Sequence, residues 1–180
     1  MKKYFFIFLS LTLLFACKSN DNDLVFKHEF SLEEQKVLQM ADTIIKTAYY
    51  CTLITLDNQN QPRARIVEPF LPEKDYTIWI ATNPKSRKVK QLKNNTAATL
   101  HYFDKNSLAY VSLMGNAFLV NDETIKAQKF KDGWDKFYPN KKEDYLLIKF
   151  VPKIVELISV NNQYPGDSIS WKPHQVILRK

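Results

Sequence analysis

The chain has 180 residues, enough for one domain with a sizeable hydrophobic core. Aromatic residues make up 13% of the chain and only 3 residues are glycine, which excludes a disordered chain and a glycine-rich repeat protein. The formal net charge of +7 favours an anionic partner: a phosphorylated cofactor, a membrane surface or nucleic acid.

The N-terminus has the pattern of an export signal. Lys2 and Lys3 precede an apolar run at residues 4–15, which is shorter than the roughly 20 residues that a membrane-spanning helix needs. The run ends in Leu14-Phe15-Ala16-Cys17, which resembles the lipobox of bacterial lipoproteins, whose cysteine becomes lipidated. We therefore expect a protein that is exported and lipid-anchored to the bacterial cell envelope, in the periplasm or on the outer membrane. An ordinary signal peptide with a coincidental cysteine is the alternative.

This signal sets the predicted domain organisation. Residues 1–16 are expected to form the signal peptide, residues 17–30 the lipidated Cys17 and a polar tether, and residues 31–180 the folded domain. Because Cys17 is consumed by the lipid, Cys51 has no intramolecular disulfide partner. The strand-like run around Cys51 predicts that it is a buried small hydrophobe.

The folded domain begins with a helix and continues in strands. Ser31 and Glu34 have capping-box spacing, and apolar residues at helical spacing predict an amphipathic helix over 32–48. The elements expected next are a strand over 49–56, a hairpin turn at 57–61 and a return strand over 64–70. Pro69 suggests that the end of the return strand is unpaired or bulged.

The next strand and helix together predict an anion site. The strand over 75–81 is stopped by Thr82-Asn83-Pro84, and a short helix over 85–94 follows with Ser86 as a plausible N-cap. This order of elements brings Thr82, Ser86, Arg87 and Lys88 to a helix N-terminus. Free N–H groups, the helix dipole and two cations there favour binding of a phosphate or similar anion. A basic helix start that merely faces water is the alternative.

The rest of the chain completes an antiparallel sheet. The elements expected are strands over 97–103 and 108–120, a helix over 122–131, an aromatic turn at 133–139, strands over 145–150 and 154–160, and a tail to residue 178. Gly115 predicts a bulge in its long strand. Six or seven hairpin-connected strands favour a small closed barrel. Several strands are apolar on both faces, so the outer face needs a helix or a second subunit to cover it.

Two separated groups of residues resemble a known cofactor site. Three short segments together resemble the core of the pyridoxamine 5'-phosphate oxidase-like, FMN-binding split barrels: Arg65-Ile66-Val67, Ala81-Thr82-Asn83 and Ser86-Arg87-Lys88. The strand at residues 110–115 fits the same core. Similarity to the general-stress-protein branch of that family lies in residues 133–139, 146–152 and Trp171-Lys172-Pro173. The resemblance implies a mainly β fold, a six-stranded antiparallel split β-barrel of Greek-key type. It also implies a homodimer with one non-covalently bound FMN in each of two interface clefts.

The resemblance further implies a role for each matching residue. The phosphate would be bound by Arg65 and Lys88, with Ser86 and Arg87 beside it. The backbone of Ile66 and Val67 would contact the isoalloxazine edge, and Ala81 and Thr82 would line the ribityl chain. Tyr110 stands where the oxidases carry a cofactor-contacting Gln. No catalytic residue is assigned. Glu68 and Pro69 replace apolar residues of the oxidases, and Trp171 is followed by no Arg until Arg179, so groups that bind pyridoxamine phosphate are not evident.

Three functional hypotheses remain. The first is an FMN-dependent oxidoreductase of low specificity, in which the flavin carries the redox chemistry. The second is a non-catalytic or stress-related module that binds haem or a deazaflavin, with His28, His101 and His174 as candidate haem ligands. The third, nucleic-acid binding through the basic helix at 85–94, is disfavoured for an exported protein. No His/Cys cluster has metal-ligand spacing, so no metal site is predicted. Trp79 and Trp134 could stack on a flavin, but core positions suit them better.

Overall fold

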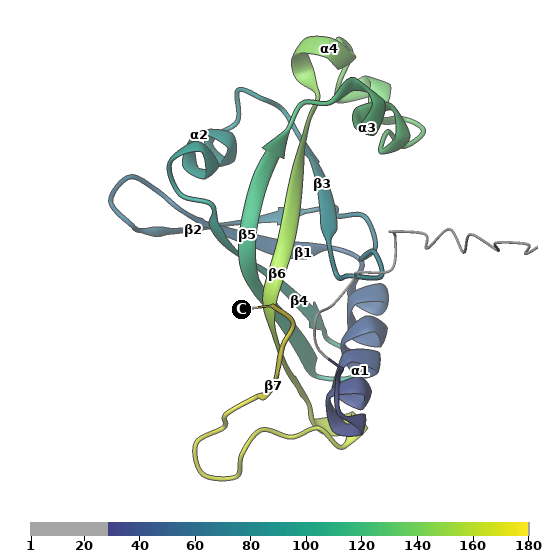
Figure 1. Ribbon diagram of the computed structural model, residues 1–180, viewed down its shortest axis with the longest axis vertical. Coiled ribbons are helices and arrows are strands. Elements are labelled where there is room, and N and C mark those ends of the chain that lie inside the picture. Colours follow the sequence, from purple (N-terminus) through teal and green to yellow (C-terminus); the bar gives the residue numbers. More distant parts are fainter. Residues whose placement is uncertain (1–28, 180) are drawn as a thin grey trace, which may run out of the picture.

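The computed structural model describes residues 29–179 (Figure 1). Its elements are α1 (Leu32–Ala48), β1 (Cys51–Leu56), β2 (Pro62–Val67), β3 (Ile78–Thr82), α2 (Arg87–Asn94), β4 (Ala97–Asp104), β5 (Ala109–Val120), α3 (Glu123–Gln128), the 3-10 turn η1 (Trp134–Lys136), α4 (Lys141–Asp144), β6 (Leu146–Ser159), the 3-10 turn η2 (Val160–Asn162) and β7 (His174–Ile177). The predicted signal peptide, Cys17 and most of the tether lie outside these residues. Among residues 29–179, no helix has both the length and the apolar character needed to cross a membrane.

All paired strands are antiparallel and belong to one curled sheet. The strand order is β2-β1-β4-β5-β6-β3, and β7 pairs with β6 beside β3. The chain beyond β2 then reaches the opposite end of this order, because Pro69 bridges to Ile80 and the Phe70 N–H donates to the Trp79 carbonyl at 2.8 Å. Figure 1 shows the resulting curl, with β1 and β2 crossing the direction of β5 and β6. The predicted mainly β, six-stranded split barrel is confirmed.

Two predicted strands prove to be one. The separate strands expected over 145–150 and 154–160 form the continuous β6, because Pro152 sits opposite Gly115 where the β5–β6 register shifts. At such a bulge a ladder N–H is not required, so a proline without one is tolerated. The bulge predicted at Gly115 is thereby confirmed. The tail holds one further strand, β7, which its sequence pattern did not predict.

One face of the curled sheet, here called the inner face, packs against α1. The helix begins at the predicted capping box, in which the Ser31 hydroxyl accepts from the Glu34 N–H at 3.2 Å. Its buried stripe contacts β4, β5, β6 and β7 and consists of Val37, Leu38, Ala41, Ile44 and Ile45. Cys51 lies on the same inner face and is 2% exposed, and burial raises the pKa of its thiol to about 12. The prediction of a buried, unpaired Cys51 is therefore confirmed.

A second, smaller cluster packs under the helical segment between β5 and β6. Trp79 and Trp134 are 6% and 8% exposed and pack with Tyr145 and Leu147. The Trp134 ring makes an edge contact with Phe70, with ring centroids 5.7 Å apart. Both tryptophans are thus core residues, as their sequence context favours, and neither presents an open ring face.

We predict that Gly115→Ala destabilises the fold by about 2–3 kcal/mol, because an added methyl group overlaps the β6 backbone. A Cβ at this position would lie 2.7 Å from the Pro152 Cα and closer still to the Val151 carbonyl oxygen. Urea unfolding measures the loss. The matched control is Gly133→Ala, which meets nothing within 4 Å and is strained only by its φ of 79°. The control should lose about 1 kcal/mol. Equal stability of the two variants would contradict the close approach.

Candidate functional site

The residues of the predicted anion site lie at the junction of β3 and α2. Thr82 ends β3, a turn held by the Asn83 side chain follows, and Ser86 occupies the N-cap position of α2. The Ser86 hydroxyl does not cap the helix. Instead its Oγ lies 3.1 Å from the Thr82 Oγ1, and although the Val89 N–H donates to the Ser86 carbonyl, no side chain caps the N–H groups of Arg87 and Lys88 at the start of α2. The structure therefore brings together the residues that the sequence analysis grouped here, and the anion site remains a prediction.

Arg65 reaches this junction from β2. Its Nη1 donates to the Thr55 Oγ1 at 2.6 Å and to the Leu53 carbonyl at 3.2 Å, and its Nη2 donates to the Gln91 Oε1 at 2.8 Å. The Thr55 hydroxyl also donates to the Gln91 Oε1 at 2.7 Å, which ties the acceptors together. All of these acceptors are neutral. The guanidinium is held in one orientation while its positive charge stays uncompensated.

Lys88 completes the cationic cluster. Its Nζ donates to the Thr82 Oγ1 at 3.0 Å. Burial, and then the charge of Arg65, lowers the pKa of Lys88, while burial, and then the charge of Arg87, lowers the pKa of Arg65. No carboxylate among residues 29–179 forms an ion pair with any of these three cations.

This charge arrangement is unfavourable without a ligand. The first turn of α2 carries two cations and no acidic residue, although a helix N-terminus attracts negative charge. Mutual repulsion of partly buried cations adds to that cost. A bound dianion would reduce both the repulsion between the cations and their unfavourable interaction with the helix dipole. Its oxygens would accept hydrogen bonds from N–H, guanidinium and ammonium donors within one small region.

The remaining predicted residues divide between two faces of the sheet. Val67 shares the inner face with Arg65, and Ala81 precedes Thr82 on β3. Ile66 points to the outer face and is 68% exposed. Tyr110 also lies on the outer face, with its ring centroid 5.4 Å from that of His101. Within one chain, the structure does not bring Tyr110 to the cationic cluster.

Thr55 and Gln91 are site residues that sequence reasoning missed. Thr55 is 0% exposed and Gln91 is 9% exposed, so both are buried polar groups whose partner is a charged one. A signal for Thr55 was available, because Cys51, Leu53 and Thr55 alternate on the inward face and only Thr55 is hydroxylated. Gln91 lies one turn after Arg87 on the buried side of α2, next to Leu92.

The candidate haem ligands do not converge. His101 Nδ1 lies 2.9 Å from the Ser112 Oγ, and His174 Nε2 lies 2.9 Å from the Pro165 carbonyl. Burial lowers the pKa of His101. His28 lies outside the described residues. No group of three or more His, Cys, Asp or Glu residues within 29–179 is arranged to hold a metal ion.

The fold and the site together define a curled split barrel with a cluster of cations at a helix N-terminus. The chain belongs to the pyridoxamine 5'-phosphate oxidase family, since the family model of that description matches residues 38–159. The resemblance to this family is thereby confirmed. No curated protein sequence matches the chain.

Solved structures share the fold. A protein from Clostridium acetobutylicum related to general stress protein 26 of Bacillus subtilis is 20% identical, with a TM-score of 0.66, over 80% of this chain and 96% of that one. A pyridoxamine 5'-phosphate oxidase-related, FMN binding protein from Nostoc punctiforme is 14% identical, with a TM-score of 0.58, over 84% and 99%. A heme binding protein from Mycobacterium smegmatis is 17% identical, with a TM-score of 0.57, over 76% and 56%.

Proposed function

We propose that this protein is an FMN-binding flavoprotein, of the general-stress-protein type, that acts as a low-specificity oxidoreductase at the cell envelope. The observation that carries the proposal is the cluster of Arg65, Arg87 and Lys88 around the N-terminus of α2, which forms no ion pair with a carboxylate among residues 29–179. A phosphate monoester dianion fits these donors. The flavin would supply the redox chemistry, and the chain would bind and orient it.

The other site residues extend from this phosphate position. Thr82 and Ala81 would line the ribityl chain, and the backbone of Ile66 and Val67 would border the isoalloxazine edge. Tyr110 lies on the outer face, so it would contact the cofactor only of a second copy of the chain. A homodimer with a site at the interface is therefore part of the proposal.

Haem is the second candidate. It is supported by the heme binding protein with the same fold and by His101, whose lowered pKa, caused by burial, favours the neutral imidazole that ligates iron. A deazaflavin cofactor would use the same phosphate donors as FMN. For the location, we propose a lipid anchor at Cys17, on the strength of the lipobox-like residues 14–17.

An absorbance spectrum of the protein, purified from its native envelope without added cofactor, tests the proposed function. We expect flavin bands that bleach when a nicotinamide donor is added. A Soret band instead would show that the bound cofactor is haem and would contradict FMN binding. A colourless protein that also fails to take up added FMN would contradict both.

The variant Arg65→Ala with Lys88→Ala should lose FMN binding and keep its fold, because both side chains donate to the phosphate and neither belongs to the apolar core. Fluorescence quenching of FMN measures the affinity, and circular dichroism measures the fold. The matched control is Lys90→Ala with Lys93→Ala, which removes two exposed charges from the same helix. Unchanged FMN affinity in the first variant would contradict the site.

We also predict that Gln91→Glu weakens FMN binding by at least about tenfold, or about 1.4 kcal/mol. A glutamate keeps the bonds that Gln91 accepts from Arg65 and Thr55, but its charge compensates the guanidinium. Riboflavin, which lacks the phosphate, should bind the variant and the wild type equally. Gln39→Glu on the exposed side of α1 adds the same charge elsewhere and serves as the control. If FMN and riboflavin respond alike to Gln91→Glu, the uncompensated charge of Arg65 does not serve the phosphate.

A further inference from the structure

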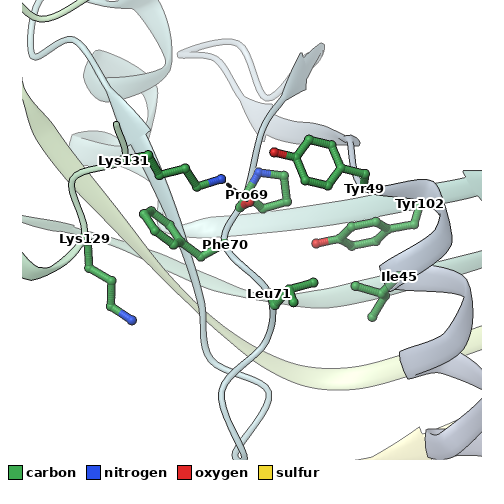
Figure 2. A pocket seen from close by; sticks show the side chains of 8 residues that line it. All are labelled: Ile45, Tyr49, Pro69, Phe70, Leu71, Tyr102, Lys129 and Lys131. Carbon is green, nitrogen blue, oxygen red and sulfur yellow. Dashed lines mark hydrogen bonds between the residues drawn. The ribbon is translucent and has the colours of Figure 1, made fainter. Parts of the chain in front are cut away.

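A pocket separate from the cationic cluster lies between the C-terminal end of α1 and the segment that follows β2. It encloses about 410 Å³, a volume within the range of small-molecule sites. Figure 2 shows its lining side chains, which are Ile45, Tyr49, Pro69, Phe70, Leu71, Tyr102, Lys129 and Lys131. Most of the lining is apolar or aromatic.

The lining of the pocket includes a polar group that lacks a strong hydrogen-bond partner. Tyr102 on β4 is 0% exposed, and its hydroxyl forms no hydrogen bond to oxygen or nitrogen within the part of the chain that the structure describes. Its polar neighbour is the Cys51 thiol, a weak donor and acceptor, and burial raises the pKa of the phenol well above its usual value. In Figure 2 the hydroxyl points toward the side of the pocket where Phe70 and Leu71 lie. Buried polar groups are nearly always paired, so an unpaired one calls for a specific explanation.

The two lysines at the pocket are already neutralised. Lys129 Nζ forms an ion pair with Glu73 at 2.8 Å, and Lys131 Nζ forms one with Glu68 at 2.7 Å. Glu68 also accepts from the Tyr49 hydroxyl at 2.7 Å. A carboxylate or phosphate ligand would have to displace these glutamates, so the pocket favours a neutral ligand. This is the opposite of the preference at Arg65 and Lys88.

We propose that this pocket binds a small, neutral, largely apolar molecule, such as an aromatic ketone, whose carbonyl oxygen accepts a hydrogen bond from the Tyr102 hydroxyl. The apolar walls supply the binding energy and the hydroxyl supplies the orientation. The hydroxyl atom exposes less than 1 Å² in the free protein, so one lining side chain must move aside. Leu71 is the candidate, because it is 58% exposed and little restrained by packing.

A pair of ligands of nearly equal shape tests the proposal. Acetophenone carries a carbonyl group, and isopropylbenzene has a methyl group in place of that oxygen. Both are titrated into the full chain while the backbone amide signals of Phe70 and Leu71 are followed by NMR. We expect both ligands to shift these signals, with acetophenone binding about five- to tenfold more tightly, the contribution of one hydrogen bond.

Two variants separate the hydroxyl from the cavity. Tyr102→Phe should abolish the preference for acetophenone and leave isopropylbenzene binding unchanged. Its thermal midpoint should fall little, because the interaction that the hydroxyl loses is with the Cys51 thiol, a weak hydrogen-bonding partner. Leu71→Trp, at an exposed position, should fill the pocket and abolish binding of both ligands.

Three results would overturn the proposal. One is no shift of the Phe70 and Leu71 signals up to the solubility limit of either ligand, as expected if the pocket holds only water. Another is a preference for acetophenone that survives Tyr102→Phe, and the third is unchanged binding in Leu71→Trp. The variant Arg65→Ala with Lys88→Ala should bind acetophenone as the wild type does, so the outcome is independent of FMN binding.

Discussion

The pairing of β5 with β6 along nearly their whole length holds this structure together. The opposite edge of β6 pairs with two shorter strands, β3 near the start of β6 and β7 near its end. The positions of β3, β5 and β7 therefore all depend on their register with β6. The two long strands can lie this close only because Gly115 faces the β6 backbone at the bulge, where a side chain would overlap it. The bulge also bends the sheet, and a bent sheet can bring its two ends together at Pro69 and Ile80.

The curl of the sheet decides where the charges meet. Arg65 belongs to β2 at one end of the strand order, and α2 follows β3 at the other end. Because these ends meet, Arg65 donates to Gln91 from 26 residues away in the chain. The resulting cluster of cations costs electrostatic free energy, which the packed barrel sustains. Energetically unfavourable arrangements of this kind are typical of binding sites, since the ligand relieves what the fold alone does not.

The chain after Arg65 connects two environments of opposite character. Arg65 faces a region of uncompensated positive charge, whereas Pro69, Phe70 and Leu71 line a pocket whose nearby charges are paired. Glu68 stands between them and is tied to Lys131 and Tyr49. The hydrogen bond from Lys131 lowers the pKa of Glu68, so this carboxylate stays ionised and remains paired with the Lys131 ammonium group. The segment at residues 65–71 thus leads from a positively charged environment to an apolar one.

By itself, the sequence determined the features that depend on near neighbours. The capping box at Ser31 and Glu34, the helix α1, the bulge at Gly115 and the grouping of Thr82, Ser86 and Lys88 all follow from spacings of a few residues, over which periodicity and capping act. Only the tertiary structure decided which distant groups meet. Strand order and register bring Thr55 and Gln91 to Arg65 and pair Lys131 with Glu68 across 63 residues. They also leave the Tyr102 hydroxyl without an oxygen or nitrogen partner among the described residues. Strand order and register are properties of the whole sheet, which no local pattern encodes.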